Sequence, residues 1–427
     1  MNLWADLENN HLLPDTVEHG RPQRMRRITE RIILSSLRDW LLQDYVAPYC
    51  RSLGAMRIYR RCYWIDGLGI DSKANPLPPP VAPEPQSTTR PAKRRKKESV
   101  QVVPPALQPI VTLSQTLALE SKPITLYGLM METGDSKRKE TKAAKNGATR
   151  DLVLPKESGI ARASWLEVAP TLLKEIEQSP TIFLLNPLGL KMFTQDDLAP
   201  LYQRTVPTEL FLLLPHKQIE AQLLAAAKAP EQAAMLTGVL RTDRWKALLA
   251  KEQGIKGAVD GFIELFMAAM QRHFLFPVQR LALPFPSGPA VIEDAPYTLL
   301  FATRRQDSLL GMNDAVSRHQ RLVHEQSCQG ILGEEWFATQ QRERMEAAMQ
   351  QLYQRVLQQG RAQRTRRWPD LRQQLLLANF GQFTLYDYDI IIQKLLLHRE
   401  VRCEWRRPPV SPEENRVPGN DDTLIWR

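Results

Sequence analysis

The feature that most constrains the fold is an alternation of short apolar segments with helical segments through the middle of the chain. Apolar runs typical of buried strands occur at RIYRRCYWIDGLG, PITLYGLMME, TIFLL and TELFLLLP. Between them, the apolar periodicity predicts helices at residues 164–178, 195–203 and 217–227. Strands that alternate with helices form a parallel sheet that is covered on both faces. We therefore expect an α/β domain with a doubly wound sheet.

Two later apolar segments refine the expected topology. VQRLALPF and PYTLLFATR lie close together in the sequence, with no clear helix between them. We expect them to form an antiparallel pair at the edge of the sheet, an ending that distinguishes methyltransferase-type sheets from all-parallel dinucleotide-binding sheets. Residues 231–273 are predicted to be helical and to cap the sheet. Residues 21–49 are predicted to form an amphipathic helix that ends at Pro48.

The composition changes between residues 71 and 123. The chain holds 32 prolines, and this segment carries Pro-rich runs such as NPLPPPVAPEP together with the basic run KRRKK at residues 93–97. Such a segment cannot bury enough apolar surface to offset its chain entropy, so it is predicted to be a disordered insertion. The basic run fits a nuclear address, a tether to nucleic acid or a solubilising charge. The insertion divides the α/β domain into residues 1–70 and 124–328.

Residues 329–427 have a different pattern. A long helical segment leads to two helices, one around DLRQQLLLA and one that contains residues 390–396, and then to the strands VRCEWR and TLIWR. Two helices followed by two strands around a polar loop form the winged-helix pattern, although the loop here is acidic, which weakens a role in phosphate contact. A basic cluster in this domain either binds the phosphates of a nucleic acid or solvates a helix; it consists of Arg361, Arg364, Arg366 and Arg367.

Length, charge and cysteine usage narrow the class of protein. A chain of 427 residues is expected to hold two or three domains. Its net charge of +10 favours acidic partners such as nucleic acid, although basic chains also stay soluble in this way. The four cysteines form no C-x-x-C pair, so we expect neither a metal site nor a disulfide framework. No apolar run reaches the length of a membrane span and the N-terminus is polar, which predicts a cytoplasmic protein without membrane contact.

The end of the first strand has the pattern of a nucleotide-binding loop. An adenosyl cofactor needs a tight glycine turn after the first strand, and an acidic residue after the second strand to bind the ribose hydroxyls. Asp66, Gly67 and Gly69 supply the turn, and Glu132 supplies the acid once the insertion is set aside. The cofactor that fits this pattern is S-adenosylmethionine. A single G-x-G also occurs as a tight turn without a ligand.

A second candidate corner follows the strand TIFLL. Asn186 and Pro187 stand where amino-methyltransferases carry a polar residue and a proline beside the transferred methyl group. The polar side chain there can accept a hydrogen bond from the nucleophile, so these two residues are the candidate catalytic residues. Leu188 occupies the position of the aromatic residue that would stack on a flipped base, which argues against base methylation. The alternative is a turn that only ends the strand.

These segments, taken in order, resemble the three-Cys-motif partner family. RMRRITERIILSSLRDWL is similar to a helix of the R-x-x-I-x-E-x-I-L type, and YWIDGLGID to a YIDGFAGPG-like loop. SPTIFLLNPLGL is similar to an S-P-x-F-F-F-I-D-P-F-G block, and LRTDRW more weakly to an FG-x-x-x-W-like segment. YTLLFATRRQDSLLGM is similar to Y-x-L-x-F-A-T followed by G-x-x-x-M. The resemblance covers most of the chain outside the insertion, and its specificity comes from the shared order of the blocks.

The resemblance implies a class I methyltransferase-like fold, and a partner protein that carries a three-cysteine, radical-enzyme-like motif. Two departures from the family bear on activity. Ile70 and Asp71 replace the A-G-P-G part of the loop, which crowds the close approach of backbone to ligand that glycine permits. Asn186 replaces the family's acidic residue and removes a negative charge from the expected reaction centre.

These features leave three functional hypotheses open. The first is an S-adenosylmethionine-dependent methyltransferase that acts on a nucleic acid or a partner protein, in which Asp66 orients the cofactor, Glu132 its ribose and Asn186 the nucleophile. The second is a catalytically inactive methyltransferase-like scaffold that binds a partner protein or DNA through its winged-helix-like C-terminal domain. The third is a transcription regulator whose α/β domain senses a nucleotide.

Overall fold

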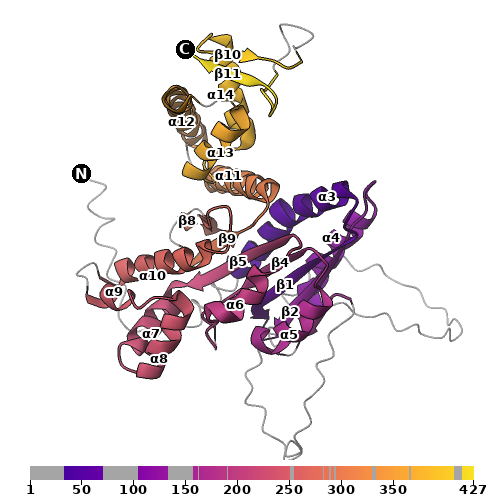
Figure 1. The fold of residues 1–427 in the computed structure, drawn as a ribbon, viewed down its shortest axis with the longest axis vertical. Coiled ribbons are helices and arrows are strands. Elements are labelled where there is room, and N and C mark those ends of the chain that lie inside the picture. The colour runs from indigo at the N-terminus through magenta and orange to yellow at the C-terminus, as the bar shows by residue number, and fades with distance from the viewer. Residues whose placement is uncertain are drawn as a thin grey trace, which may run out of the picture.

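The computed structural model describes two domains that Figure 1 shows joined through the long helix α11 (Gln306–Cys328). Several sequence-based predictions lie outside the described residues: residues 21–32 of the predicted N-terminal helix, Asp71, the basic run at 93–97, and Arg366. The described residues are 33–70, 104–132, 157–161, 163–189, 191–250, 254–281, 283–287, 290–292, 295–328, 333–364, 367–407 and 416–427.

The centre of the larger domain is a seven-stranded, mostly parallel sheet. The order across the sheet is β3 (Gly159–Ala161), β2 (Thr125–Glu132), β1 (Arg61–Ile70), β4 (Thr181–Leu185), β5 (Thr208–Pro215), β9 (Tyr297–Ala302) and β6 (Gln279–Leu281). The first five strands in this order run parallel to one another, whereas β9 is antiparallel to both β5 and β6. The predicted mostly parallel sheet with an antiparallel pair at its edge is therefore confirmed.

Apolar side chains extend from both faces of this sheet, because the side chains of neighbouring residues in a strand point in opposite directions. In β1, Ile65 is buried in the core on one face and Trp64 in the core on the other. Burial on both faces explains why TIFLL and TELFLLLP are continuous apolar runs rather than alternating ones. The first face is covered by α5 (Trp165–Glu175), α6 (Gln195–Tyr202), α7 (His216–Ala226), α8 (Pro230–Leu240), α9 (Lys246–Ala250) and α10 (Gly254–Gln271).

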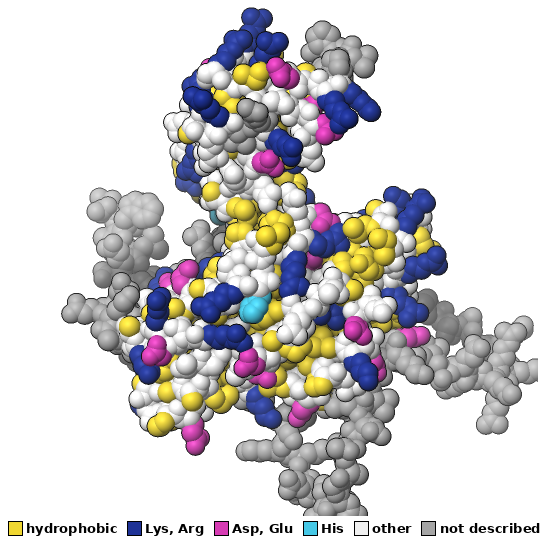
Figure 2. Space-filling view, in the orientation of Figure 1, with side chains coloured by type: hydrophobic (Ala, Val, Ile, Leu, Met, Phe, Trp, Pro, Cys, Tyr) yellow, Lys and Arg dark blue, Asp and Glu magenta, His cyan; other side chains and the backbone are white. Residues whose placement is uncertain are grey.

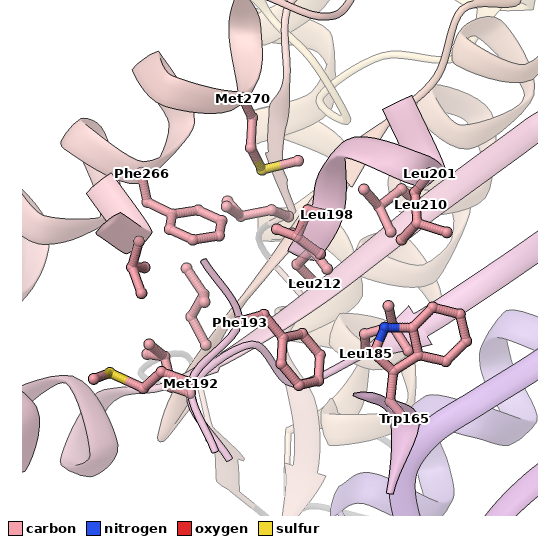
Figure 3. Packing of buried hydrophobic residues seen from close by; sticks show 14 of the residues in the cluster. Trp165, Leu185, Met192, Phe193, Leu198, Leu201, Leu210, Leu212, Phe266 and Met270 are labelled. Atoms are coloured by element: carbon pink, nitrogen blue, oxygen red, sulfur yellow. The ribbon is translucent and has the colours of Figure 1, made fainter. Parts of the chain in front are cut away.

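The core under these helices reaches the end of β4. Figure 3 shows Trp165, the first residue of α5, lying beside Leu185 and close to Phe193. The Trp165 and Phe183 rings meet edge to face with their centroids 5.6 Å apart. Trp165 is held there by a capping box, in which the backbone N–H of Ser164 donates a 2.9 Å hydrogen bond to Glu167. The helix predicted at residues 164–178 is therefore present, with Ser164 as its N-cap.

The N-terminal helical segment does not end at Pro48 as predicted. Residues 33–40 are α-helical and continue through a π-helical turn (η2, Leu41–Val46) into α3 (Ala47–Met56). Proline lacks an amide hydrogen, and its ring crowds the carbonyl of the residue four positions earlier. The wider turn just before Pro48 accommodates both defects. The helix therefore ends only before Arg57, whose φ of 60° is left-handed.

Part of the predicted disordered insertion is ordered. Residues 104–122 hold a 3-10 turn (η3, Pro105–Leu107) and then α4 (Gln108–Ala118). The predicted boundary at residue 123 is wrong because proline fits the first turn of a helix as well as it fits a disordered segment. Together with the N-terminal helices and α11, α4 covers the second face of the sheet, through Leu107, Ile110 and Leu117 among others. Residues 71–103 lie outside the described residues.

A short hairpin that the sequence did not predict lies between β6 and β9 in the chain. Its strands, β7 (Phe285–Ser287) and β8 (Ala290–Ile292), pair in antiparallel fashion as a separate two-stranded sheet. Both strands contact α11, and the carbonyl of Pro284 lies 2.8 Å from the His319 ring. The hairpin therefore connects the edge of the main sheet with the helix that leads to the second domain.

The C-terminal domain has its own apolar core, which is formed by three helices and an antiparallel strand pair. Trp368, Tyr388 and Ile392 are among its buried residues. The predicted succession of helices and strands is present as expected. Its elements are α12 (Glu334–Gln363), α13 (Trp368–Ala378), α14 (Leu385–Leu397), β10 (Val401–Glu404) and β11 (Thr423–Trp426).

Helix α11 belongs to both domains. Its Val316 side chain packs in the second core of the sheet, next to Gly381 of the C-terminal domain. Its buried Asn313 accepts a hydrogen bond from the Gly381 N–H and donates one to the carbonyl of Phe383, both at 2.8 Å. Asp314 accepts a further 2.8 Å hydrogen bond from the N–H of Leu385. The two domains therefore share a hydrogen-bonded contact in addition to the chain connection.

Candidate functional site

The predicted cofactor and catalytic residues lie at one edge of the sheet. Asp66 of β1 is in register with Met130 of β2 and Leu184 of β4, and Ile70 is in register with Glu132. Because these strands are parallel and adjacent, their carboxyl ends meet, and Asn186 follows directly after β4. The structure thus brings Asp66, Gly67, Gly69 and Glu132 close to Asn186 and Pro187.

The side chain of Asp66 is fully buried and bonded within the protein. Arg38, from the N-terminal helical segment, donates to its Oδ2 atom at 2.6 Å and to its Oδ1 atom at 3.3 Å. The N–H of Leu68 donates to Oδ1 at 3.0 Å, and Arg38 also donates to the carbonyl of Gly69 at 3.1 Å. Burial alone would lower the pKa of Arg38, but the charge and hydrogen bonds of Asp66 raise it above its ordinary value.

The two glycines of the turn have different roles in the structure. A Cβ atom at Gly67 would lie 2.6 Å from the Leu185 side chain and 3.8 Å from the Cβ atom of Trp165. The room left by the absent side chain of Gly67 is therefore filled by the protein core. Gly69 has a φ of 91°, a left-handed conformation that favours glycine. It allows β1 to continue to Ile70 through an irregular register, where the sequence predicted that the strand would end.

The Asn-Pro corner after β4 is a compact turn. The Asn186 side-chain oxygen accepts a 2.9 Å hydrogen bond from the N–H of Leu188, and its amide donates to Gln218 of α7 at 3.0 Å. Pro187 is buried, and its carbonyl accepts a 2.8 Å hydrogen bond from the N–H of Phe193. Asn186 is half-buried, and its side-chain oxygen has a second lone pair that the hydrogen bond within the turn does not use. The corner thus has a structural role and retains one acceptor that could face a ligand.

The predicted phosphate-binding arginines are only partly grouped. Arg361 of α12 donates to Glu400 at 2.7 Å, so its charge is compensated within the domain. Arg364 follows the end of α12 with a left-handed φ of 48°, and Arg367 precedes α13. The side chains of Arg364 and Arg367 are exposed, whereas Arg366 lies outside the described residues. Figure 2 shows dark-blue basic side chains gathered at the far tip of this domain.

A buried polar cluster that the sequence did not predict lies towards the opposite, amino-terminal edge of the sheet. Glu209 of β5 is fully buried, and the Tyr45 hydroxyl donates a 3.1 Å hydrogen bond to it. Burial raises the pKa of the Glu209 carboxyl to about 7, although nearby hydroxyl groups, including the Tyr45 donor, and the charge of Arg305 act in the opposite direction. A single charged residue within the apolar run TELFLLLP was the signal that could have revealed it.

The residues that the structure describes show no sign of a metal centre or a membrane-spanning helix. Among them, no group of three or more His, Cys, Asp or Glu side chains could hold a metal ion. None of the described helices combines the length and the apolar character needed to traverse a lipid bilayer. No family model, curated protein or solved structure matches the chain.

Proposed function

We propose that the larger domain is a class I methyltransferase-like scaffold that does not use S-adenosylmethionine, and that the protein acts by binding a partner. The methyltransferase-like part is supported by the parallel strands β3 to β5 and by the antiparallel β9 between β5 and β6. It is also supported by the resemblance to the three-Cys-motif partner family, whose blocks fall on β1, β4 and β9.

The observation that carries the proposal is the environment of Asp66. A carboxylate that orients a cofactor has to present an oxygen atom to it. The Asp66 side chain is 0% exposed, and both of its oxygens are bonded to Arg38. Opening this pair would leave a buried charge without its partner, which costs several kcal/mol. Asp66 therefore fits a structural ion pair that fixes the N-terminal helix to the sheet.

The surroundings of Gly67 support the same view. In nucleotide-binding turns, glycine makes room for the ligand to approach the backbone. Here the side chain of Leu185 lies 2.6 Å from where a Cβ atom at Gly67 would stand, which supports a packing role for this glycine rather than contact with S-adenosylmethionine. Trp165 and Leu185 are both buried in the core of the domain, and neither is a surface side chain that a ligand could displace cheaply.

Isothermal titration of the full chain with S-adenosylmethionine tests the loss of cofactor binding. We expect no heat of binding at millimolar ligand. A stoichiometric interaction with micromolar affinity would contradict the scaffold proposal and restore the methyltransferase. In that event Asn186→Ala, which removes the side-chain acceptor at this corner together with its hydrogen bond from the N–H of Leu188, is the variant with which to look for a loss of methyl transfer without a loss of binding.

The proposed partner is a protein with a three-cysteine motif, as the resemblance implies. A docking anchor for it is the aromatic pair Trp336 and Phe337 at the start of α12, whose rings lie 4.9 Å apart, edge to face. Trp336 is 58% exposed and Phe337 is 37% exposed, which is unusual for aromatic side chains without a partner. Exposed aromatic residues of this kind supply a large share of the affinity in protein interfaces.

Co-expression with a three-cysteine-motif protein encoded beside this chain, followed by size-exclusion chromatography, tests the partner. We expect a stable complex that the double substitution Trp336→Ala, Phe337→Ala weakens by at least ~10-fold. Arg344→Ala, which alters an exposed residue of the same helix, is the control and should leave the complex intact. Failure to form a complex, or equal loss with the control, would count against this partner.

A second candidate function is nucleic-acid binding by the C-terminal domain, because Arg364 and Arg367 are exposed cations beside α13. Fluorescence anisotropy with a DNA duplex at several salt concentrations tests it. If the two arginines contact phosphates, neutralising both should reduce the slope of log affinity against log salt by roughly two. Arg280→Gln, on the sheet domain, should leave the slope unchanged. A slope that is the same in all three proteins would exclude this role for Arg364 and Arg367.

A further inference from the structure

A cavity of about 350 Å³ opens at the amino-terminal edge of the sheet, opposite the edge that holds Asp66 and Asn186. Its walls come from the connection between α3 and β1, the connection between α6 and β5, Phe274 after α10, and the two arginines that follow β9. We propose that this cavity binds a small monoanionic ligand, a carboxylate on an aromatic or aliphatic body. This inference goes beyond the proposed scaffold function and does not depend on it.

The size and the apolar lining of the cavity suit a small organic molecule. Its volume lies at the lower end of the range for ligand pockets. Leu201, Leu210 and Phe274 contribute apolar wall. At its mouth, Met56 and Ile58 are 49% and 73% exposed, so large apolar side chains there face water. Apolar surface that surrounds a cavity is typical of a ligand site.

The cavity also contains a cation whose charge is not compensated. Arg304 donates a 2.6 Å hydrogen bond to the carbonyl of Arg204, and its guanidinium carbon lies 5.6 Å from the centre of the Phe274 ring. These contacts hold the guanidinium in place but leave its charge. Among the described residues, no carboxylate forms an ion pair with Arg304, and burial lowers its pKa. A bound anion would supply the missing negative charge.

The neighbouring Arg305 limits the charge of the ligand. It forms an ion pair with Asp307, in which Nε donates to Oδ1 at 2.9 Å, so its own charge is balanced. Its Nη1 atom is buried and has no hydrogen-bond partner among the described residues. This atom is not accessible to solvent, so the cavity offers one uncompensated charge, that of Arg304. A single positive charge beside an apolar wall fits a monoanion and disfavours a nucleoside polyphosphate, and the absence of acidic residues from the lining disfavours an amine.

Calorimetric titration of the full chain distinguishes the two kinds of ligand body and isolates the role of the charge. Decanoate and 2-naphthoate are the aliphatic and aromatic probes, and decanamide and 2-naphthamide are their uncharged counterparts. At least one carboxylate is expected to bind ~10-fold or more tightly than its amide, because hydrogen bonds to charged groups are the stronger ones. Comparison of the two carboxylates then tells which body the cavity prefers.

Substitutions tie the binding to this cavity. Arg304→Gln is expected to remove the preference for the carboxylate while the amide binds as before. Ile58→Asp, at an exposed position of the mouth, keeps the core intact and should weaken carboxylate binding by repulsion. Arg280→Gln, at an exposed ion pair with Asp260 away from the lining, is the matched control and should bind like the unaltered protein.

Three outcomes would overturn the proposal. One is that neither carboxylate binds at millimolar concentration. Another is that each amide binds as well as its carboxylate, which would make the cavity a nonspecific apolar site. The third is that carboxylate binding survives both Arg304→Gln and Ile58→Asp, which would place the bound molecule elsewhere.

Discussion

The buried carboxyl of Glu209 should make the stability of this protein depend on pH in a way that one substitution can abolish. Glu209→Gln keeps the size of the side chain and an oxygen acceptor for Tyr45, but it cannot ionise. The pKa of Glu209 is about 7 in the folded protein, against an ordinary value of 4.5. The folded state therefore binds this proton more tightly than the unfolded chain does.

The sign and the magnitude follow from proton linkage. A group with a raised pKa in the folded state contributes its full stability below the unfolded pKa, here about 4.5, and loses it as the pH rises through about 7. At ~1.4 kcal/mol for each tenfold difference in proton affinity, the loss reaches about 3 kcal/mol above neutral pH. Glu209→Gln should therefore be more stable than the unaltered protein by up to about 3 kcal/mol near pH 8, and within about 1 kcal/mol of it near pH 5.

Urea denaturation followed by tryptophan fluorescence, repeated between about pH 5 and about pH 8, measures this difference. Glu346→Gln, which alters an exposed glutamate of α12, is the control and should reproduce the pH profile of the unaltered protein. A difference in stability between Glu209→Gln and the unaltered protein that is the same at both ends of the pH range would contradict a raised pKa of Glu209.

Two further substitutions test the packing described above. Arg38→Met removes the guanidinium that pairs with Asp66 and is expected to lower the free energy of unfolding by about 3 kcal/mol. An unchanged midpoint of urea denaturation would contradict a buried ion pair. In α12, Gly360→Ala would place a Cβ atom 2.4 Å from the ring of Trp426, so a loss of about 1–3 kcal/mol is expected. Gly311→Ala in α11, with nothing within 4 Å of the added carbon, should instead stabilise by about 1 kcal/mol. Thermal denaturation that shows the same effect at both glycines would refute the contact with Trp426.

The sheet could be predicted because its central strands are buried on both faces. TIFLL matches β4 residue for residue, and TELFLLLP matches β5. In each case the apolar run ends where the strand leaves the core, so the sequence pattern and the strand bounds have the same physical cause. The antiparallel pair at the edge could be predicted equally well, because no helix separates β6 from β9 in the chain.

The two errors at prolines have a common origin. Pro48 and the proline-rich start of α4 were both interpreted from local rules, in which proline ends a helix or marks disorder. In the structure, packing decides both cases. Leu53 after Pro48, and Leu107 and Ile110 around the start of α4, are all buried against the sheet. Tertiary burial of an apolar face outweighs the local penalty, and a single sequence does not display it directly.

The position of the candidate site could be predicted, but the pairing of Asp66 with Arg38 within it could not. Parallel neighbouring strands must bring their carboxyl ends together, so Asp66, Glu132 and Asn186 had to meet once the strand order was right. The partner of Asp66 is Arg38, which lies 28 residues earlier on a helix. Which helix face would meet the end of β1 depends on how that helix packs on the sheet, and the loop sequence carries no signal of it.

Within the part of the chain that the structure describes, helix α11 packs against both domains and leaves no free joint between them. Its 23 residues span about 35 Å, and along this length its side chains alternate between the sheet core and the C-terminal domain. Separation of the domains would strip Gly381 and Phe383 of their hydrogen bonds to Asn313 and break the ion pair between Arg321 and Asp387. A load applied to the C-terminal domain is therefore transmitted through a stiff rod to the edge of the sheet, and the two domains respond to it as one mechanical unit.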